Sequence, residues 1–277
     1  MNINMLNQKS SRISAIMALV LSVLAIFSSV LGVLDSQLYR DLLQTGVISE
    51  KLMVGSVAQD IISILMGIVL LVLSIVFLKY KGLHTFICVI GLAWYFFYAY
   101  GLYVMQGNYT SIYLVYLTIF GLSIYSMIWG LVSFNKSFIE KITLSRKLSI
   151  SIAIFLGFIL FILFPVWILK ILPDISKHIP GETYGVYILD LCIVFPAFLQ
   201  IAIMLLKKNR FANILAGIAL IKTFTLCLSW GFGECYTPII LNTEINYGMA
   251  SISGLLTITS LILLILYFHN LNSTILN

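Results

Sequence analysis

The sequence predicts an all-α protein, a polytopic transmembrane helix bundle with eight spans. Of its 277 residues, 61% are hydrophobic and only 9% are charged, whereas a soluble globular protein has about 25% charged residues. The apolar residues also fall into uncharged runs of about 20 residues, the length that an α-helix needs to cross about 30 Å of hydrocarbon. The longest connections, 35–58 and 233–246, are too short for a separate soluble domain, so we expect 1–277 to form a single transmembrane domain.

Each run is bounded by charged or turn-forming residues. The expected spans are 13–34, 59–79, 84–105, 110–133, 148–170, 185–206, 211–232 and 247–268. The first run follows Lys9 and Arg12 and has no clear small-residue cleavage site, so we expect a retained helix and not a signal peptide. Proline occurs within the fifth and sixth runs, at Pro165 and Pro196, where kinks are expected.

Lysine and arginine concentrate in alternate connections, which predicts the orientation of the chain. Because basic residues favour the cytoplasmic side, we expect both termini to be cytoplasmic. The net charge of +6 is then explained by topology, and no nucleic-acid partner is expected. The residues of the basic group are Lys9, Arg12, Lys79, Lys81, Lys136, Lys141, Arg146, Lys147, Lys207, Lys208 and Arg210.

The two halves of the chain show a weak, ordered similarity. Segments 59–82 and 189–212 each begin near an aspartate, continue through an apolar helix and end at a basic turn. This pattern predicts two four-helix repeats, 13–133 and 148–268, in parallel orientation. Asp60 and Asp190 would be equivalent positions in them. The alternative is that any two apolar hairpins with basic turns look alike.

Charged residues inside spans predict a polar site, because an intramembrane charge is costly and usually faces a helix bundle or a wet cavity. Lys222 is expected near the middle of the seventh span, and Asp190 about 8 Å inside the outer end of the sixth. The two spans form a hairpin, so the side chains could meet. Asp60 is expected at the outer edge of the second span, where a solvated or capping role is the stronger interpretation.

Helical spacing adds candidates for binding a ligand or ion. Thr225 and Ser229 follow Lys222 at i+3 and i+7, which predicts one polar stripe on an apolar helix. Tyr95 and Tyr98 share one face of the third span.

Other tyrosines are expected in the outer half of the bilayer. Tyr116 is a further candidate ligand residue in the fourth span. Tyr103, Tyr109 and Tyr113 are interpreted as interfacial residues, since tyrosine is enriched where lipid meets water. A paired Asp190 and Lys222 could also serve only as a contact between helices.

Several chemistries are disfavoured by the sequence. The cysteines are isolated, the histidines lie at span ends, and no HExxH, GxSxG or P-loop pattern is present. We therefore expect no catalytic residue, no metal site and no cofactor, and an enzyme is the weaker interpretation.

The order of Gln59-Asp60, the YFFYAYG run, Asn108-Tyr109, YILDLCIVFPAF and GIALIKTFTL resembles a group of uncharacterised bacterial multi-pass membrane proteins. The resemblance covers about residues 50–235. It implies the fold and a location in the cytoplasmic (plasma) membrane of a bacterium, and it carries no activity.

Two functional interpretations follow. The first is a transporter or permease-like protein for a small solute or ion, with Asp190 and Lys222 at the centre of its site. The second is a sensory or accessory subunit that binds an unknown protein partner, in which the same pair is purely structural.

Overall fold

The computed structural model describes residues 5–35 and 37–276. It is 85% helical, and no strand occurs in the part of the chain that it describes. Eight of the described helices are long and apolar enough to cross a membrane. The predicted all-α bundle of eight spans is confirmed, and the chain has the architecture of a multi-pass membrane protein.

The long helices begin and end outside the predicted runs in several places. They are α1 (Gln8–Leu34), α3 (Glu50–Tyr80), α4 (Leu83–Met105), α5 (Tyr113–Val132), α7 (Arg146–Lys177), α8 (Tyr184–Leu189) continued by α9 (Phe195–Leu206), α10 (Arg210–Leu241) and α11 (Tyr247–Leu276). Two short helices, α2 (Gln37–Gln44) and α6 (Lys136–Ile139), lie in the connections. The largest differences from the prediction are in α3, which begins nine residues earlier than expected, and in α10, which ends nine residues later.

Polar side chains fix the helix starts. The side-chain oxygens of Asn7, Ser49, Ser145 and Asn209 accept hydrogen bonds from backbone N–H groups in the first turns of α1, α3, α7 and α10. These N–H groups have no partner within the helix, so the caps stabilise each start by about 1 kcal/mol. The caps explain why α3 and α7 begin among polar residues that an apolar run excludes.

The sixth span contains a π-helical turn, η1 (Asp190–Val194), between α8 and α9. The N–H of Phe195 donates to the carbonyl of Asp190, five residues earlier. Pro196 follows at once and has no N–H to donate. A wide turn beside a proline is a common way for a helix to absorb a missing hydrogen bond, and such turns are frequent at functional sites.

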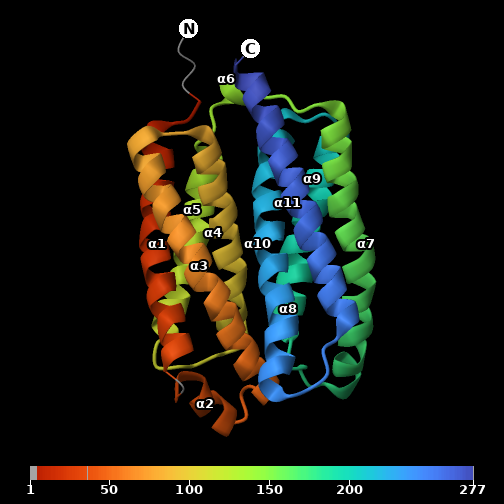
Figure 1. Cartoon of the computed structure of the whole chain (residues 1–277). Helices are drawn as coiled ribbons and strands as arrows, with labels where there is room; N and C mark the ends of the chain where they lie inside the picture. The colour runs from red at the N-terminus through yellow and green to blue at the C-terminus, as the bar shows by residue number, and fades with distance from the viewer. Residues whose placement is uncertain (1–4, 36, 277) are drawn as a thin grey trace.

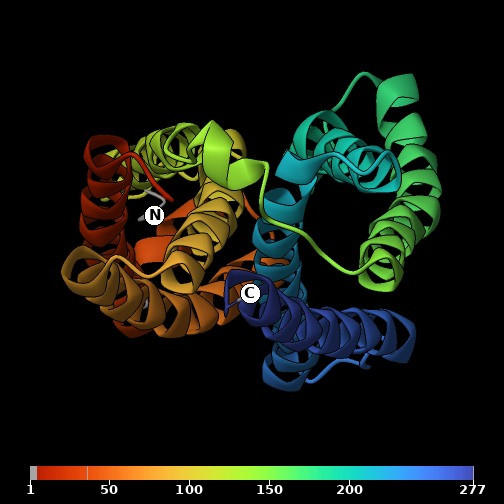
Figure 2. The same ribbon diagram turned by 90° about the horizontal axis from the view of Figure 1, so that it is seen from above.

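The helices form two groups that stand side by side (Figure 1). In the first group, α1 packs against α3 and α5, and α4 also packs against both, which closes a ring of four helices. In the second group, α7 packs against α9, and α10 packs against α9 and α11. Viewed down the bundle, α10 lies between the groups, where it also packs against α3 and α4 (Figure 2). The two-repeat interpretation stays a prediction.

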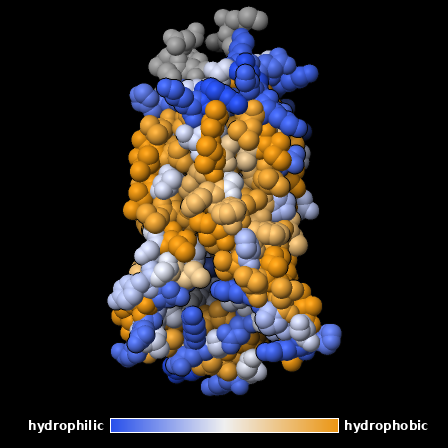
Figure 3. Space-filling model, turned by 90° about the vertical axis from the view of Figure 1, so that its right-hand side faces the viewer, coloured by the Kyte–Doolittle hydropathy of each residue, from blue (hydrophilic) through white to orange (hydrophobic). Residues whose placement is uncertain are grey.

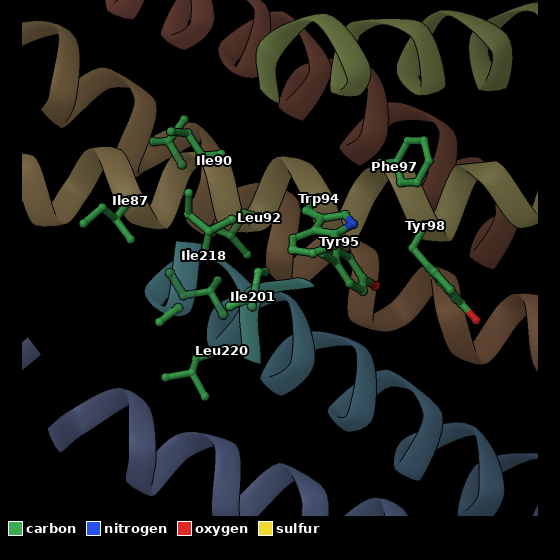
Figure 4. Close-up of a cluster of buried hydrophobic side chains, with 14 of the residues drawn as sticks. Ile87, Ile90, Leu92, Trp94, Tyr95, Phe97, Tyr98, Ile201, Ile218 and Leu220 are labelled. Atoms are coloured by element: carbon green, nitrogen blue, oxygen red, sulfur yellow. The ribbon is translucent and has the colours of Figure 1, made fainter. Parts of the chain in front are cut away.

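The contact between the groups is apolar and close. A side chain at Gly91 of α4 would collide with Ile221 of α10. The two backbones are therefore close together at this glycine, as is common where small residues lie between membrane helices. Figure 4 shows Trp94 and Ile87 of α4 near Ile218 of α10 and Ile201 of α9. This packing holds α10 in place against the first group.

The surface fits a bilayer. On the face shown in Figure 3, a hydrophobic band lies between two hydrophilic ends. The beginning of α1 and the end of α11 lie at the same end of the bundle (Figure 1), as an even number of spans requires. We call this the terminal end, and the opposite end, which carries α2, the far end. The cytoplasmic location of the terminal end stays a prediction.

Candidate functional site

A cavity of about 600 Å³ lies between the two groups. It is lined by parts of α3, α4, α7, α8, α9, α10 and α11, and by residues of the α10–α11 connection at the far end. Pockets that bind small molecules have volumes of roughly 300–1,000 Å³. The cavity therefore has the size of a ligand site, and it extends from the middle of the bundle toward the far end.

Lys222 lies in the wall of this cavity, near the middle of α10. The side chain is only 1% exposed. Its Nζ lies 4.8 Å from the ring centroid of Tyr98, 5.1 Å from that of Phe198 and 5.9 Å from that of Trp94. Aromatic faces attract a cation but do not accept a strong hydrogen bond from it.

Asp190 lines the same cavity from the opposite helix of the hairpin. It is 5% exposed, and its Oδ2 accepts a 2.8 Å hydrogen bond from Nε1 of Trp167 on α7. The Tyr98 hydroxyl lies within electrostatic reach of this carboxylate. Asp190 is the first residue of η1, so the π-helical turn sets the direction of its side chain.

The two charges act on each other without direct pairing. Lys222 and Asp190 interact electrostatically, and no salt bridge between their side chains occurs among the described residues. Tyr98 contacts both sites, since Lys222 Nζ lies over its ring and its hydroxyl lies toward Asp190. The structure therefore brings both predicted residues to one cavity and places the Tyr98 ring beside both of them, without a direct ion pair.

The other residues predicted for this site divide into two sets. Ser229 and Tyr98 line the cavity. Thr225 donates to the carbonyl of Ile221 in its own helix. Tyr95 is fully buried, with its hydroxyl 3.1 Å from that of Ser63. The cavity lining includes neither Thr225 nor Tyr95. Of the predicted polar stripe on α10, only the two ends, Lys222 and Ser229, line the cavity.

Asp60 belongs to a separate cluster inside the first group. It is 1% exposed, and its carboxylate accepts hydrogen bonds from the hydroxyls of Tyr39, at 2.5 Å, and Tyr103, at 3.3 Å. The prediction of a solvated or capping Asp60 is wrong. The reason is that α3 begins at Glu50, ten residues earlier, and α2 covers the position.

Two of the predicted tyrosine roles also change. Tyr103 is 3% exposed and both lines the cavity and donates to Asp60, so its interfacial interpretation is wrong. Tyr109 is 73% exposed, as an interfacial residue should be. Tyr116 is buried, with its ring 5.1 Å from that of Tyr103 and away from the cavity lining. Tyr103 thus forms the wall between the cavity and the Asp60 cluster.

Tyr39 was not a candidate in the sequence, because α2 is short and lies in a connection. Burial, and after it the negative charge of Asp60, raise the pKa of Tyr39 well above its ordinary value. The phenol therefore stays protonated and acts as a donor to the carboxylate. Its signal in the sequence is weak, since a lone tyrosine in a polar loop resembles any interfacial residue.

Trp167 was also missed. It lies ten residues before the end of α7, about 15 Å inside the far end of that helix. In the predicted span 148–170, however, Trp167 lies only three residues from the end, where an interfacial tryptophan is expected. The sequence therefore gives no signal for a buried donor, because the depth of Trp167 follows from the continuation of α7 to Lys177.

The site offers no obvious place for a metal. Within the ranges that the structure describes, no group of three or more His, Cys, Asp or Glu side chains could hold a metal ion. The four cysteines are free, and of these Cys227 lines the cavity. The chemistry available in the cavity is that of three ammonium groups, three carboxylates and several aromatic rings, with Lys222 and Asp190 beside Lys51, Lys170, Glu234 and Glu244.

No protein-family model, curated protein or solved structure matches the chain.

Proposed function

We propose that this protein is a transporter or permease-like protein for a small solute that carries an anionic group, with the cavity as its binding site. The observation that carries the proposal is the Lys222 ammonium, which is buried at the cavity wall, where its Nζ lies over aromatic rings and forms no salt bridge with Asp190. A buried charge without an acceptor is costly. An anionic group in the cavity would supply the acceptor.

Asp190 has a different part in the proposal. Trp167 holds its carboxylate in the cavity wall, where its charge partly offsets that of Lys222 when no ligand is bound. A solute anion that approaches Lys222 would take over this role. The fixed position of the carboxylate also restricts which orientation of a bound solute is favourable.

The alternative, a sensory or accessory subunit with a purely structural pair, would be favoured by a direct ion pair between the two helices. The contacts of the two side chains, to Trp167 and to the rings around Lys222, favour the cavity interpretation instead.

The test is uptake by the purified full chain in proteoliposomes, measured with a panel of radiolabelled carboxylates and phosphates. We expect Lys222→Met and Asp190→Asn each to abolish uptake while the yield and monodispersity of the membrane-inserted protein stay unchanged. Lys79→Met is the matched control, because Lys79 lies at the end of α3 and outside the cavity lining. Normal uptake by both cavity variants would contradict the proposal.

A further inference from the structure

The polarity of the cavity lining differs from one side of the cavity to the other. The charged groups Lys222 and Asp190 lie in α10 and at the start of η1. In the middle of the bundle the lining toward α7 and α11 is apolar, with Ile159 and Leu163 on α7 and Leu256 on α11. Nearer the far end, Lys170 of α7 and Glu244 before α11 also line the cavity. A ligand beside Lys222 would therefore meet charge from α10 and η1 on one side and hydrocarbon from α7 and α11 on the other.

The second group of helices is open on the side of these apolar residues. In the first group, α1 packs against α5 and closes the ring. The corresponding helices of the second group, α7 and α11, are tied near the terminal end by a hydrogen bond from Ser145 N–H to the side chain of Asn270. They lie apart toward the far end (Figure 2). Figure 3 looks onto this side, and its surface is hollowed between the middle of the apolar band and the far end.

The outer surfaces of α7 and α11 face hydrocarbon. Phe161 of α7 is 80% exposed and Leu255 of α11 is 65% exposed, as expected for side chains in contact with lipid tails. A cavity with apolar lining on the side of such an opening does not exclude acyl chains. A site for a fully water-soluble solute would instead need its apolar side sealed by packed helices.

We infer that the ligand of the cavity is an amphiphile, a lipid with an anionic headgroup that enters from the membrane between α7 and α11. Its headgroup would bind Lys222, and its chain would lie along Ile159, Leu163 and Leu256 and continue through the opening into the bilayer. The inference rests on the proposed function and names the substrate class of the same site. The volume of about 600 Å³ suits it, since only the headgroup and the first part of a chain need to fit inside.

The experiment measures binding to the purified full chain in detergent with three probes. Oleoyl lysophosphatidic acid carries both a phosphate and a chain, glycerol 3-phosphate carries the phosphate alone, and monooleoylglycerol carries the chain alone. We expect the first probe to bind at least about tenfold more tightly than either of the others. Lys222→Met should weaken it by about tenfold or more, because charge-assisted hydrogen bonds to phosphate are lost.

A second variant tests the proposed entry of the lipid chain between α7 and α11. Leu163→Trp fills part of the apolar lining on α7 and should weaken binding of oleoyl lysophosphatidic acid several-fold, with binding of glycerol 3-phosphate unchanged. The matched control is Phe161→Trp, which places the same side chain on the lipid-facing side of α7 and should leave binding of both probes unchanged.

The outcomes separate the two proposals. If glycerol 3-phosphate binds as tightly as the lipid and depends on Lys222, the amphiphile inference is wrong and the proposed function stands. Equal binding of monooleoylglycerol and the lysolipid would also overturn the inference, since the headgroup would then contribute nothing. If no anionic probe depends on Lys222, both proposals fail.

Discussion

The hydroxyl of Tyr39 donates a 2.5 Å hydrogen bond to the carboxylate of Asp60 and so joins the short helix α2 to the interior of the first helix group. Tyr103 donates to the other carboxylate oxygen from α4. A carboxylate that is 1% exposed thus has donors from two directions, and α2 is held against the far end of the bundle by a buried contact.

Replacement of Tyr39 by Phe should lower the free energy of unfolding by about 1–3 kcal/mol, because a buried carboxylate loses one of its donors. Thermal unfolding of the purified protein in detergent measures the change. Tyr80→Phe is the control, since Tyr80 is 68% exposed and its hydroxyl should contribute less than about 0.5 kcal/mol. Equal stability of the two variants would mean that Asp60 does not depend on α2.

Replacement of Gly32 by Ala should also destabilise the protein, because the added Cβ would collide with the Asp60 carboxyl group. Overpacking of this kind costs about 1–3 kcal/mol. Gly157→Ala is the matched control within a helix, as its Cβ would meet open space. Because alanine is the better helix former, that variant should be neutral or slightly stabilised, and the same thermal unfolding assay compares the pair.

Trp167→Phe tests the donor to Asp190. It keeps an aromatic ring in α7 and removes the Nε1 hydrogen bond, so we expect a loss of about 1–3 kcal/mol in the free energy of unfolding. Trp129→Phe, at a site 37% exposed on α5, should have a much smaller effect. Indistinguishable unfolding curves for the two variants would show that the Asp190 carboxylate finds another donor.

The combined replacement of Asp190 and Lys222 by Leu separates binding from helix packing. If the pair only joins helices, the double variant should recover function, because an isolated buried charge is the costly state. We expect no recovery: the two single variants and the double variant should all fail in the uptake assay, since each lacks a group that contacts the ligand. Restored uptake in the double variant would favour the structural role.

The fold was predictable because each membrane span can be recognised from one continuous apolar run in the sequence. Eight uncharged runs of about 20 residues are enough to locate eight helices. The start of α3 was not predictable in this way, since Glu50, Lys51 and Ser56 interrupt the apolar run. Backbone hydrogen bonds continue a helix beyond the hydrocarbon whatever the polarity of its side chains.

The site was predictable in part for a similar reason. Asp190 and Lys222 lie on helices that are neighbours in the chain, so a short turn brings them together. Their contacts come from elsewhere: Trp167 lies on α7, and Tyr98 lies on α4 in the other group. Such contacts depend on how helices pack, which periodicity along one chain does not determine.

The π-helical turn at Asp190–Val194 makes the sixth span sensitive to the deletion of a single residue, and no other described helix contains such a turn. It holds one residue more than an ordinary turn, so the helical phase of α8 is offset from that of α9 by about 100°. Loss of one residue within this turn would leave the span long enough to cross the bilayer. It would rotate Tyr187 and the Asp190 carboxylate out of the cavity. The number of residues in this span therefore determines the direction of its side chains as well as its reach across the bilayer.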